Sequence, residues 1–167
     1  MKIAILATGG TFDKEYNELN GNLYFKKTHI REMLSMGRCH LPVRIQVVMM
    51  KDSLEMTDND REQILDACRS CDESRVVITH GTDTMEHTGG FLAGKLADKT
   101  IVLTGAMVPY TFGSSDGLFN LGSALSFAQV LPRGVFIAMN GRFFNAQEVR
   151  KDRQRGVFVQ SGGRKTR

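Results

Sequence analysis

Hydroxyl, carboxylate and glycine residues cluster in four short segments, Thr8–Thr11, Asp52–Ser53, His80–Asp83 and Thr104–Gly105. A threonine hydroxyl becomes a nucleophile when a neighbouring group accepts its proton, and backbone N–H groups can stabilise the oxyanion that its attack creates. Carboxylate and serine side chains can bind the charged ends of a small polar ligand. These residue types favour an active site with a threonine nucleophile and a pocket for an anionic group, if the four segments meet in space.

Each polar segment directly follows a run of apolar and β-branched residues that is typical of a buried strand. Gly81 permits a sharp bend after one of these runs, and we expect His80 to pack beneath that bend without titrating in a reaction. In an open parallel sheet, the carboxyl ends of the strands share one edge, where ligands bind. We therefore expect the four segments to meet at one edge. The runs that precede them are Lys2–Ala7, Val43–Met50, Val76–Thr79 and Thr100–Leu103.

Strand and helix patterns alternate along the chain, and a fifth strand is expected at Gly134–Met139. This alternation predicts a single α/β domain with a doubly wound, mostly parallel sheet, Rossmann-like and three-layered, with right-handed crossovers. The polar segment Asp13–Leu23 is expected to be a long loop of the kind that covers ligand sites. The expected helices are His29–Met36, one that follows the capping box Thr57–Asp60, Thr84–Ala97 and Asn120–Val130.

The chain of 167 residues is long enough for one domain with its own core. Its apolar fraction of 41% and charged fraction of 24% are ordinary for a globular protein. No apolar run approaches the length of a transmembrane helix, and Ile3–Ala7 is too short for the apolar part of a signal peptide. We therefore expect a cytoplasmic protein without a membrane partner.

The net charge of +4 arises at the end of the chain, because the segment 150–167 holds seven Lys or Arg and one Asp. This segment contributes +6 and the rest of the chain −2. A solvated terminal segment is therefore favoured over a nucleic-acid groove, and no nucleic-acid partner is expected. We expect an α/β domain over residues 1–160 and a basic tail over residues 161–167.

Three cysteines raise the question of a metal site. Cys68 and Cys71 form a CxxC motif, and Cys39 with His40 could complete a zinc set. The motif closes a helix pattern and lacks a second pair at zinc-ribbon spacing, which favours free thiols. The odd cysteine count argues against a disulfide framework. We expect no metal ion.

Two further motifs lack the context that their chemistry requires. Gly9-Gly10 does not extend to the glycine pattern of a dinucleotide site or to the lysine of a phosphate-binding loop. The segment Gly113–Gly117 matches GxSxG, but a proline and a loop precede Ser115 and the last histidine, His87, comes before it. A hydrolase nucleophile elbow needs a strand before the serine and a histidine after it, so Ser115 is excluded as a nucleophile.

The motifs that remain are Thr8-Gly9-Gly10-Thr11-Phe12 and His80-Gly81-Thr82-Asp83-Thr84-Met85. Together they resemble the paired signatures of the bacterial-type L-asparaginase family, and the resemblance spans nearly the whole chain. It implies hydrolysis of L-asparagine to L-aspartate and ammonia, with L-glutamine as a further candidate substrate, and no metal or organic cofactor. The other segments that carry it are Asp52–Met56, Gly105–Pro109, Ser115–Gly117, Asn120–Leu121, Met139–Asn140 and Lys151.

The resemblance implies that the nucleophile is Thr11 and that an acyl-enzyme intermediate forms on it. The family's second threonine, its aspartate and its lysine fall on Thr82, Asp83 and Lys151. Lys151, held neutral beside the other two side chains, could accept the proton of the nucleophile. Asp83 would pair with the α-ammonium group of the substrate.

The same resemblance implies a set of substrate-binding residues. Ser53 corresponds to the serine that holds the α-carboxylate of the substrate, and Tyr16 corresponds to a loop tyrosine that could serve as the base in place of Lys151. Tyr24 is the alternative for this tyrosine. Backbone N–H groups at Gly10 or Thr82 could stabilise the oxyanion. The residues assigned to substrate binding are Ser53, Asp52, Gly10 and Gly81.

Full-length members of the family carry a second, smaller C-terminal domain, and this chain is expected to be a short form without it. Assembly as a homodimer or homotetramer is expected, with an interface that differs from the family's. The alternative to an enzyme is a non-catalytic or weakly active amino-acid-binding module of the same fold. A third interpretation, amide hydrolysis that feeds ammonia to a partner in an amidotransferase assembly, needs an additional N-terminal region and ranks last.

Overall fold

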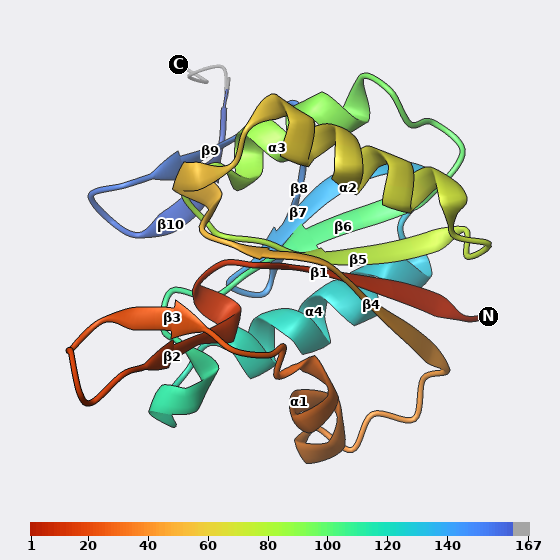
Figure 1. The fold of residues 1–167 in the computed structure, drawn as a ribbon. Coiled ribbons are helices and arrows are strands. Elements are labelled where there is room, and N and C mark those ends of the chain that lie inside the picture. The colour runs from red at the N-terminus through yellow and green to blue at the C-terminus, as the bar shows by residue number, and fades with distance from the viewer. Residues whose placement is uncertain (162–167) are drawn as a thin grey trace.

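A six-stranded sheet forms the centre of the protein in a computed structural model that describes residues 1–161 (Figure 1). The strand order is β4-β1-β5-β6-β7-β8; the first five strands in this order run parallel, and β8 runs antiparallel to β7. This confirms the expected α/β class with a mostly parallel sheet. The strands are β1 (Ile3–Gly9), β4 (Val43–Lys51), β5 (Arg75–Thr79), β6 (Thr100–Thr104), β7 (Gly134–Met139) and β8 (Arg142–Asn145).

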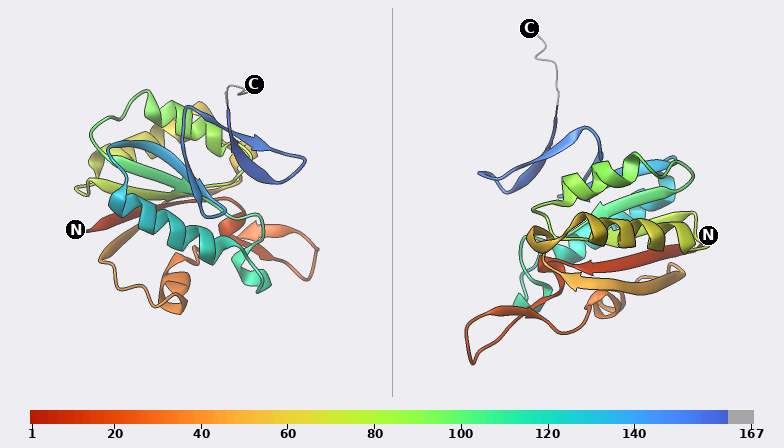
Figure 2. Two further views of the ribbon diagram at one scale, coloured as in Figure 1. Left: turned by 180° about the vertical axis from the view of Figure 1, so that it is seen from behind. Right: turned by 45° about the horizontal axis from the view of Figure 1, so that its top comes forward.

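Helices cover both faces of the sheet, which confirms the expected three layers (Figures 1 and 2). One face packs against α2 and α3, and the opposite face packs against α1 and α4. Side chains of β1 alternate between the two layers, with Ile3 and Ile5 facing α1 and α4 and with Ala4 and Leu6 facing α2 and α3. All four are fully buried, as expected for a strand of a parallel sheet that is covered on both faces. The helices are α1 (Ile30–Met36), α2 (Asp58–Ser70), α3 (Met85–Ala93) and α4 (Gly117–Val130).

The capping box before α2 is confirmed. The N–H and hydroxyl groups of Thr57 donate to Asp60 Oδ2 at 2.7 and 2.8 Å, and Asp60 N–H donates back to Thr57 Oγ1 at 3.3 Å. Two other helix limits differ from the expected ones. Helix α3 ends at Ala93, because Gly94 closes it with a bond to the carbonyl of Gly90. Helix α4 begins at Gly117, since Ser115 Oγ accepts a bond from the Gly117 N–H.

One crossover has the opposite hand to the expected one. The connections through α1, α2 and α3 are right-handed, but α4 lies on the same face as α1 although the chain moves from β6 to β7 in the direction it took from β5 to β6 (Figures 1 and 2). The β6–α4–β7 crossover is therefore left-handed, a rare arrangement. The long connection 105–116 carries the chain around the edge of the sheet before α4 begins, so the right-handed prediction is wrong for this unit.

Two β-hairpins project from the carboxyl edge of the sheet, one beside each helical layer (Figures 1 and 2). One consists of β2 (Lys14–Tyr16) and β3 (Leu23–Phe25), and the other of β9 (Val149–Asp152) and β10 (Val157–Gln160). The expected long loop Asp13–Leu23 is therefore wrong at both ends, because its ends pair with each other as strands of three residues. Strands this short leave little alternation in the sequence.

The second hairpin also changes the interpretation of the basic segment. Residues 150–160, expected to be solvated, include the paired strands β9 and β10, and Val149 and Phe158 are buried against the core of the α2–α3 layer. Of the expected tail 161–167, residues 162–167 lie outside the described residues. Within residues 1–161, no helix combines the length and the apolar composition needed to cross a bilayer.

Candidate active site

The polar segments follow the strands β4, β1, β5 and β6 and therefore lie at one edge of the sheet. Their spatial order along this edge is Asp52–Ser53, Gly10–Thr11, Gly81–Thr82 and Gly105. The chain leaves β1 and β6 towards the layer of α1 and α4, and leaves β5 towards the layer of α2 and α3. Adjacent strands whose connections leave to opposite faces open a crevice between their carboxyl ends. Thr11 and Thr82 follow the two strands on either side of this crevice.

Glycine contacts hold the first and third segments together. A Cβ atom added to Gly10 would lie 2.3 Å from the backbone nitrogen of Gly81, and the φ angle of Gly10 is 74°. Only glycine combines this close approach with a positive φ. The segment that begins with Thr11 is therefore packed backbone to backbone against the segment that contains Thr82.

The second and fourth segments approach the third in the same way. A Cβ atom on Gly81 would lie 2.6 Å from Ser53 Oγ, and a Cβ atom on Gly105 would lie 2.4 Å from the His80 carbonyl oxygen. Thr84 Oγ1 donates to the Ser53 carbonyl at 2.8 Å, which fixes the start of α3 against the segment after β4. The four segments thus form one packed unit at the carboxyl edge.

A lysine from the second hairpin completes a polar cluster with this unit. Lys151 Nζ donates to Thr82 Oγ1 and to Asp83 Oδ1, both at 2.8 Å. Thr82 is 5% exposed and the Lys151 side chain 6%, whereas the Asp83 side chain is 36% exposed. The Lys151 and Thr82 side chains are therefore shielded from water, while the Asp83 carboxylate is partly open to solvent. Thr84, and not Thr82, is the N-cap residue of α3, so the Thr82 hydroxyl is not used as a helix cap.

Contacts along β9 hold Lys151 in place. The Lys151 N–H donates to Glu86 Oε2 from the first turn of α3. Arg153, in the turn after β9, donates to Asp83 Oδ1 at 3.3 Å and to the Asp83 carbonyl at 3.0 Å. Neither Glu86 nor Arg153 was predicted from the sequence. Arg153 lies in the turn after β9, so strand alternation carries no signal for it.

The buried His80 supports the bend after β5. Its Nδ1 donates to the Gly81 carbonyl at 2.7 Å, and its Nε2 accepts a bond of 2.9 Å from Thr88 Oγ1. Burial is the main cause that lowers the pKa of His80 to about 4, and this neutral imidazole satisfies both partners. The structure thus places His80 beneath the bend, as expected from the sequence.

Thr11 and the two tyrosines lie outside the cluster formed by Thr82, Asp83 and Lys151. Thr11 is half-buried at the start of a 3-10 helix, η1 (Thr11–Asp13), directly after Gly10. Tyr16 is 54% exposed on β2 and Tyr24 is 38% exposed on β3, where its hydroxyl donates to Glu15 at 3.4 Å. Among residues 1–161, Tyr16 makes no hydrogen bond to Thr11 or to the lysine cluster. The structure brings Thr82, Asp83 and Lys151 together, and it leaves Tyr16 outside this group.

Two of the residues assigned to substrate binding are engaged within the protein. The Gly10 N–H donates to the Lys51 carbonyl at 3.0 Å, so the expected oxyanion donor at Gly10 is wrong; Thr82 remains the candidate donor. Asp52 accepts a bond from the Leu54 N–H at 3.0 Å and an ion pair from Lys14. Burial opposes its ionisation, but the bonds from Lys14 and Leu54 hold the pKa of Asp52 below its usual value. Asp52 therefore ties the first hairpin to the segment after β4.

The other motifs singled out in the sequence form no second site. Ser115 Oγ donates to the Val108 carbonyl at 2.6 Å, and the 3-10 helix η3 (Tyr110–Phe112), not a strand, precedes it. Cys71 Sγ bonds to the Cys68 carbonyl at 3.2 Å, and burial raises the pKa of Cys68 to about 12. Residues 1–161 contain no group of three or more His, Cys, Asp or Glu side chains that could hold a metal ion.

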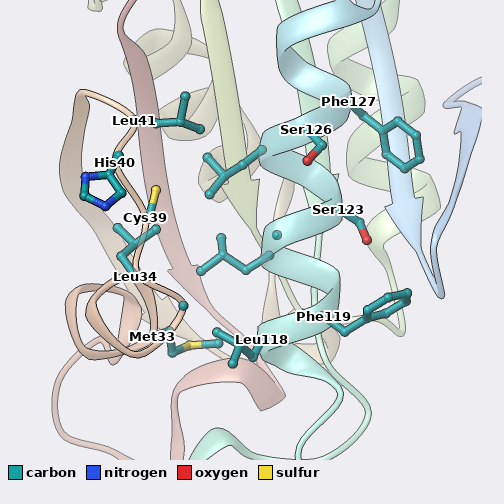
Figure 3. A pocket seen from close by; sticks show the side chains of 14 residues that line it. Met33, Leu34, Cys39, His40, Leu41, Leu118, Phe119, Ser123, Ser126 and Phe127 are labelled. Atoms are coloured by element: carbon teal, nitrogen blue, oxygen red, sulfur yellow. The ribbon is translucent and has the colours of Figure 1, made fainter.

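A cavity of about 630 Å³ lies away from this unit, between α1, the segment 37–41 and α4 (Figure 3). Apolar side chains such as Met33, Leu41 and Phe127 line it, with His40 and Ser126 as polar groups. It holds no carboxylate and no ion pair, unlike the cluster at the carboxyl edge. The polar unit, rather than this cavity, is therefore the candidate active site.

Comparison with known proteins identifies the family of the chain. The model of the family described as "Asparaginase, N-terminal" matches residues 2–158. A glutaminase-asparaginase of Pseudomonas fluorescens biotype A is 32% identical over 162 residues, which cover 89% of this chain and 45% of that protein. The structure of the thermostable L-asparaginase from Thermococcus kodakarensis superposes with a TM-score of 0.85 at 28% identity, covering 96% of this chain and 51% of that chain.

A third relative is the probable cytoplasmic L-asparaginase from Campylobacter jejuni, whose structure superposes with a TM-score of 0.75 at 32% identity. The match covers 90% of this chain and 49% of that chain. The chain thus spans about half the length of the relatives it matches. Since the family match extends over nearly all of the sequence, the chain belongs to the asparaginase family.

Proposed function

We propose that this protein is an L-asparaginase-type amidohydrolase that converts L-asparagine to L-aspartate and ammonia, with Thr11 as the nucleophile. The observation that carries the proposal is the cluster in which Lys151 bonds to both Thr82 and Asp83 at 2.8 Å. This cluster sits on the segment that packs directly against the one containing Thr11, through Gly10. A hydroxyl, a shielded amine and a half-exposed carboxylate beside a second hydroxyl suit amide hydrolysis.

The reaction has two steps, acylation of Thr11 with release of ammonia and hydrolysis of the resulting ester, and neither step needs a cofactor. Thr11 Oγ1 gives up its proton and attacks the side-chain amide carbon, which forms a tetrahedral oxyanion that the Thr82 N–H stabilises. Loss of one such donor typically costs about 3 kcal/mol. The C–N bond then breaks, the leaving nitrogen takes a proton and departs as ammonia, and water hydrolyses the acyl-threonine ester.

We take Lys151 as the proton acceptor, acting through the Thr82 hydroxyl, because Nζ and Oγ1 lie 2.8 Å apart. The bond in the structure is donated by Nζ, so this role requires the amine to have lost its proton and to accept along the same line. Tyr16 is the alternative, and it requires the first hairpin to close over the crevice. On the substrate, the α-ammonium group pairs with Asp83 and the α-carboxylate with Ser53, which lies beneath Gly81.

The proposal also places the protein in the cytoplasm, as a homodimer or homotetramer of α/β domains formed by residues 1–160. A relative named a probable cytoplasmic L-asparaginase supports this location. Recognition of L-glutamine beside L-asparagine is supported by a relative named a glutaminase-asparaginase. Because the chain spans about half of these relatives, substrate range and affinity are to be measured on this chain itself.

The test is an ammonia assay with L-asparagine, L-glutamine and D-asparagine over a wide concentration range. Ammonia release from L-asparagine by the wild-type chain, abolished in both Thr11→Ala and Thr82→Ala, is the expected result. The matched control is Thr111→Ala, which removes an exposed threonine whose hydroxyl, among residues 1–161, bonds to the Lys14 carbonyl alone, at 3.2 Å. This variant is expected to retain activity.

Calorimetric binding of L-asparagine or L-aspartate without ammonia release would overturn the enzyme proposal in favour of an amino-acid-binding module. Unfolding curves of both threonine variants must match the wild type, because only then does a loss of activity report on chemistry. Activity that survives Thr11→Ala in a folded protein would remove Thr11 from the mechanism.

A further inference from the structure

Arg153 makes a contact with the candidate site that the family motifs did not suggest. Its guanidinium donates to Asp83 twice, from Nη1 to the carboxylate oxygen Oδ1 at 3.3 Å and from Nη2 to the backbone carbonyl at 3.0 Å. Lys151 Nζ donates to the same Oδ1 at 2.8 Å. Two cations of the β9–β10 hairpin, Lys151 on β9 and Arg153 in the turn, therefore converge on one oxygen of one carboxylate.

This convergence leaves the second carboxylate oxygen of Asp83 available. Among the described residues, Oδ2 of Asp83 accepts no hydrogen bond, and the side chain is 36% exposed. A carboxylate that is held through one oxygen and its own backbone carbonyl cannot rotate freely about its side-chain bonds. The free oxygen is therefore fixed in direction before a ligand arrives.

We propose that Arg153 is a positioning residue that orients the Asp83 carboxylate, so that its free oxygen can receive a cationic group of the ligand. The inference rests on the proposed function in taking that group to be the α-ammonium of an amino acid. Arg153 acts through Asp83 and does not itself touch the ligand. Its contribution is pre-organisation, which improves affinity by reducing the ordering that binding requires.

An arginine suits this task better than a lysine. The planar guanidinium carries several N–H donors in a fixed fork, so one side chain can reach a carboxylate oxygen and a carbonyl oxygen at once. An ammonium is a compact point charge that reaches these two acceptors less well in a fixed geometry. The two bonds to Asp83 are thus a feature that Arg153→Lys is expected to lose in part.

A purely structural role fits the exposure poorly. The Arg153 side chain is 62% exposed, and exposed ion pairs contribute little to folding stability. Removing it should therefore leave the protein folded, as judged by the unfolding midpoint. The remaining alternative is a general electrostatic effect, in which the positive charge attracts any anionic ligand to the carboxyl edge.

The positioning role and the general charge effect predict different ligands to be weakened most when Arg153 is replaced. Calorimetry should compare L-aspartate, the proposed product, with succinate, which has the same two carboxylates but lacks the ammonium group. With Arg153→Gln, we expect the dissociation constant of L-aspartate to rise about tenfold, the loss typical of one charge-assisted hydrogen bond, and that of succinate to change less than about twofold. A charge effect would weaken succinate more, since it carries the larger net negative charge.

Arg155→Gln is the matched control, because Arg155 is an exposed arginine of the same turn whose only bond to another of the residues 1–161 is from its backbone N–H to Asp152 at 3.2 Å. This variant should leave both dissociation constants within about twofold of the wild type. Arg153→Lys should fall between the wild type and Arg153→Gln for L-aspartate.

The inference is overturned if Arg153→Gln affects succinate as much as L-aspartate, if it tightens L-aspartate binding, or if the wild type binds no L-aspartate. These outcomes are separate from failure of the proposed function. Binding of L-aspartate with the expected Arg153 dependence but without ammonia release would reject only the enzyme. Ammonia release with no Arg153 dependence of binding would reject only the positioning role.

Discussion

The two hairpins, β2–β3 and β9–β10, both lie at the carboxyl edge of the sheet (Figure 1), but they are anchored to the rest of the protein in different ways. The β9–β10 hairpin buries Val149 and Phe158 in the core and connects to α3 and to the segment after β5 through Lys151 and Arg153. The β2–β3 hairpin leaves Tyr16, Leu23 and Tyr24 exposed, with Tyr16 54% and Leu23 46% accessible, and Phe25 is half-buried.

The contacts of the β2–β3 hairpin lie at its base. Lys14 pairs with Asp52, and the Lys14 carbonyl accepts a bond from Thr111 at 3.2 Å. Asp13, the last residue of η1, is fully buried and accepts bonds from the Thr28 hydroxyl and the His29 N–H. Segments with few buried contacts open at low free energy, and ligand-binding lids are drawn from such segments. The comparison indicates that the β9–β10 hairpin and the segment after β5 form a pre-organised half of the site. The β2–β3 hairpin forms a second half, which must move to contact a ligand.

Replacing Lys151 would break the pre-organised half and should have the largest effect. Lys151→Met keeps the apolar stem but removes the bonds to Thr82 and Asp83. We expect the turnover number for L-asparagine to fall about 1,000-fold, within the range typical of a lost general base. Asp83 keeps its bonds to Arg153, so the unfolding midpoint should change little. Steady-state kinetics and thermal unfolding measure the two quantities.

The control for this variant is Arg150→Met, which changes the neighbouring, exposed position on the opposite face of β9. It should leave turnover unchanged. If Lys151→Met retained more than a tenth of the wild-type turnover number, the pre-organised hairpin would have no part in the chemistry, and the contrast between the two hairpins would be one of stability alone.

The glycine contact that joins the two halves is the next place to test. Gly10→Ala would put a Cβ atom 2.3 Å from the Gly81 nitrogen at a φ of 74°, which no side-chain movement can relieve. We expect the free energy of unfolding in urea to fall by more than about 3 kcal/mol. Gly90→Ala is the control, since a Cβ atom there meets nothing within 4 Å inside α3. This substitution should raise stability by about 0.5–1 kcal/mol. Equal stability of the two variants would mean that the two segments can separate without cost.

The bend on the pre-organised side should respond to acid through His80. Burial lowers the pKa of His80 from 6.5 to about 4. Between these values the unfolded chain binds a proton that the folded protein excludes, so the free energy of unfolding decreases as the pH falls from 6.5 towards 4. The decrease amounts to at most about 3 kcal/mol. Urea unfolding at a series of pH values measures it.

The variant His80→Gln should remove most of this dependence between pH 6.5 and 4. Two paired carboxylates, Asp60 and Glu73, titrate in a separate window, since the bonds from Lys51 and Arg44 lower the pKa of each to about 2. Their contribution is present above pH 4 and is lost as the pH falls towards 2, in the variant as in the wild type. An unchanged pH profile above pH 4 in His80→Gln would show that the bend is not sensitive to this imidazole.

The central strands and the pre-organised segment could be predicted because their signals are local. Buried β-branched runs end in glycine and hydroxyl residues, and the position of each run relative to the carboxyl edge follows from the parallel sheet alone. The prediction of one shared edge required no knowledge of the connections. The left-handed crossover through α4 could not be predicted, because its hand depends on the path of the segment 105–116 around the sheet.

The hairpins were less predictable for a related reason. Each strand of the β2–β3 pair has three residues, and their pairing joins positions across a polar turn. The basic residues near the end of the chain suggested solvated charge, since the sequence does not show which of them meets a carboxylate. Lys151 and Arg153 are distinguished from Arg155 only by the distant partner Asp83. A basic composition predicts exposed side chains on average, but an ion pair with a distant carboxylate can bury a single one of them.

The two tyrosines of the β2–β3 hairpin test the second half of the site. Their replacement is expected to have the smallest effect on activity. If the β2–β3 hairpin closes over the crevice on ligand binding, the tyrosine that faces the ligand contributes one hydroxyl contact. We expect Tyr16→Phe to lower kcat/KM for L-asparagine about tenfold, as for one lost hydrogen bond in the transition state. Tyr24→Phe should change it less than about twofold, because the Tyr24 hydroxyl already donates to Glu15 at 3.4 Å on the same hairpin. The reverse order would assign the loop role to Tyr24, and two unchanged variants would show that the hairpin stays open during turnover.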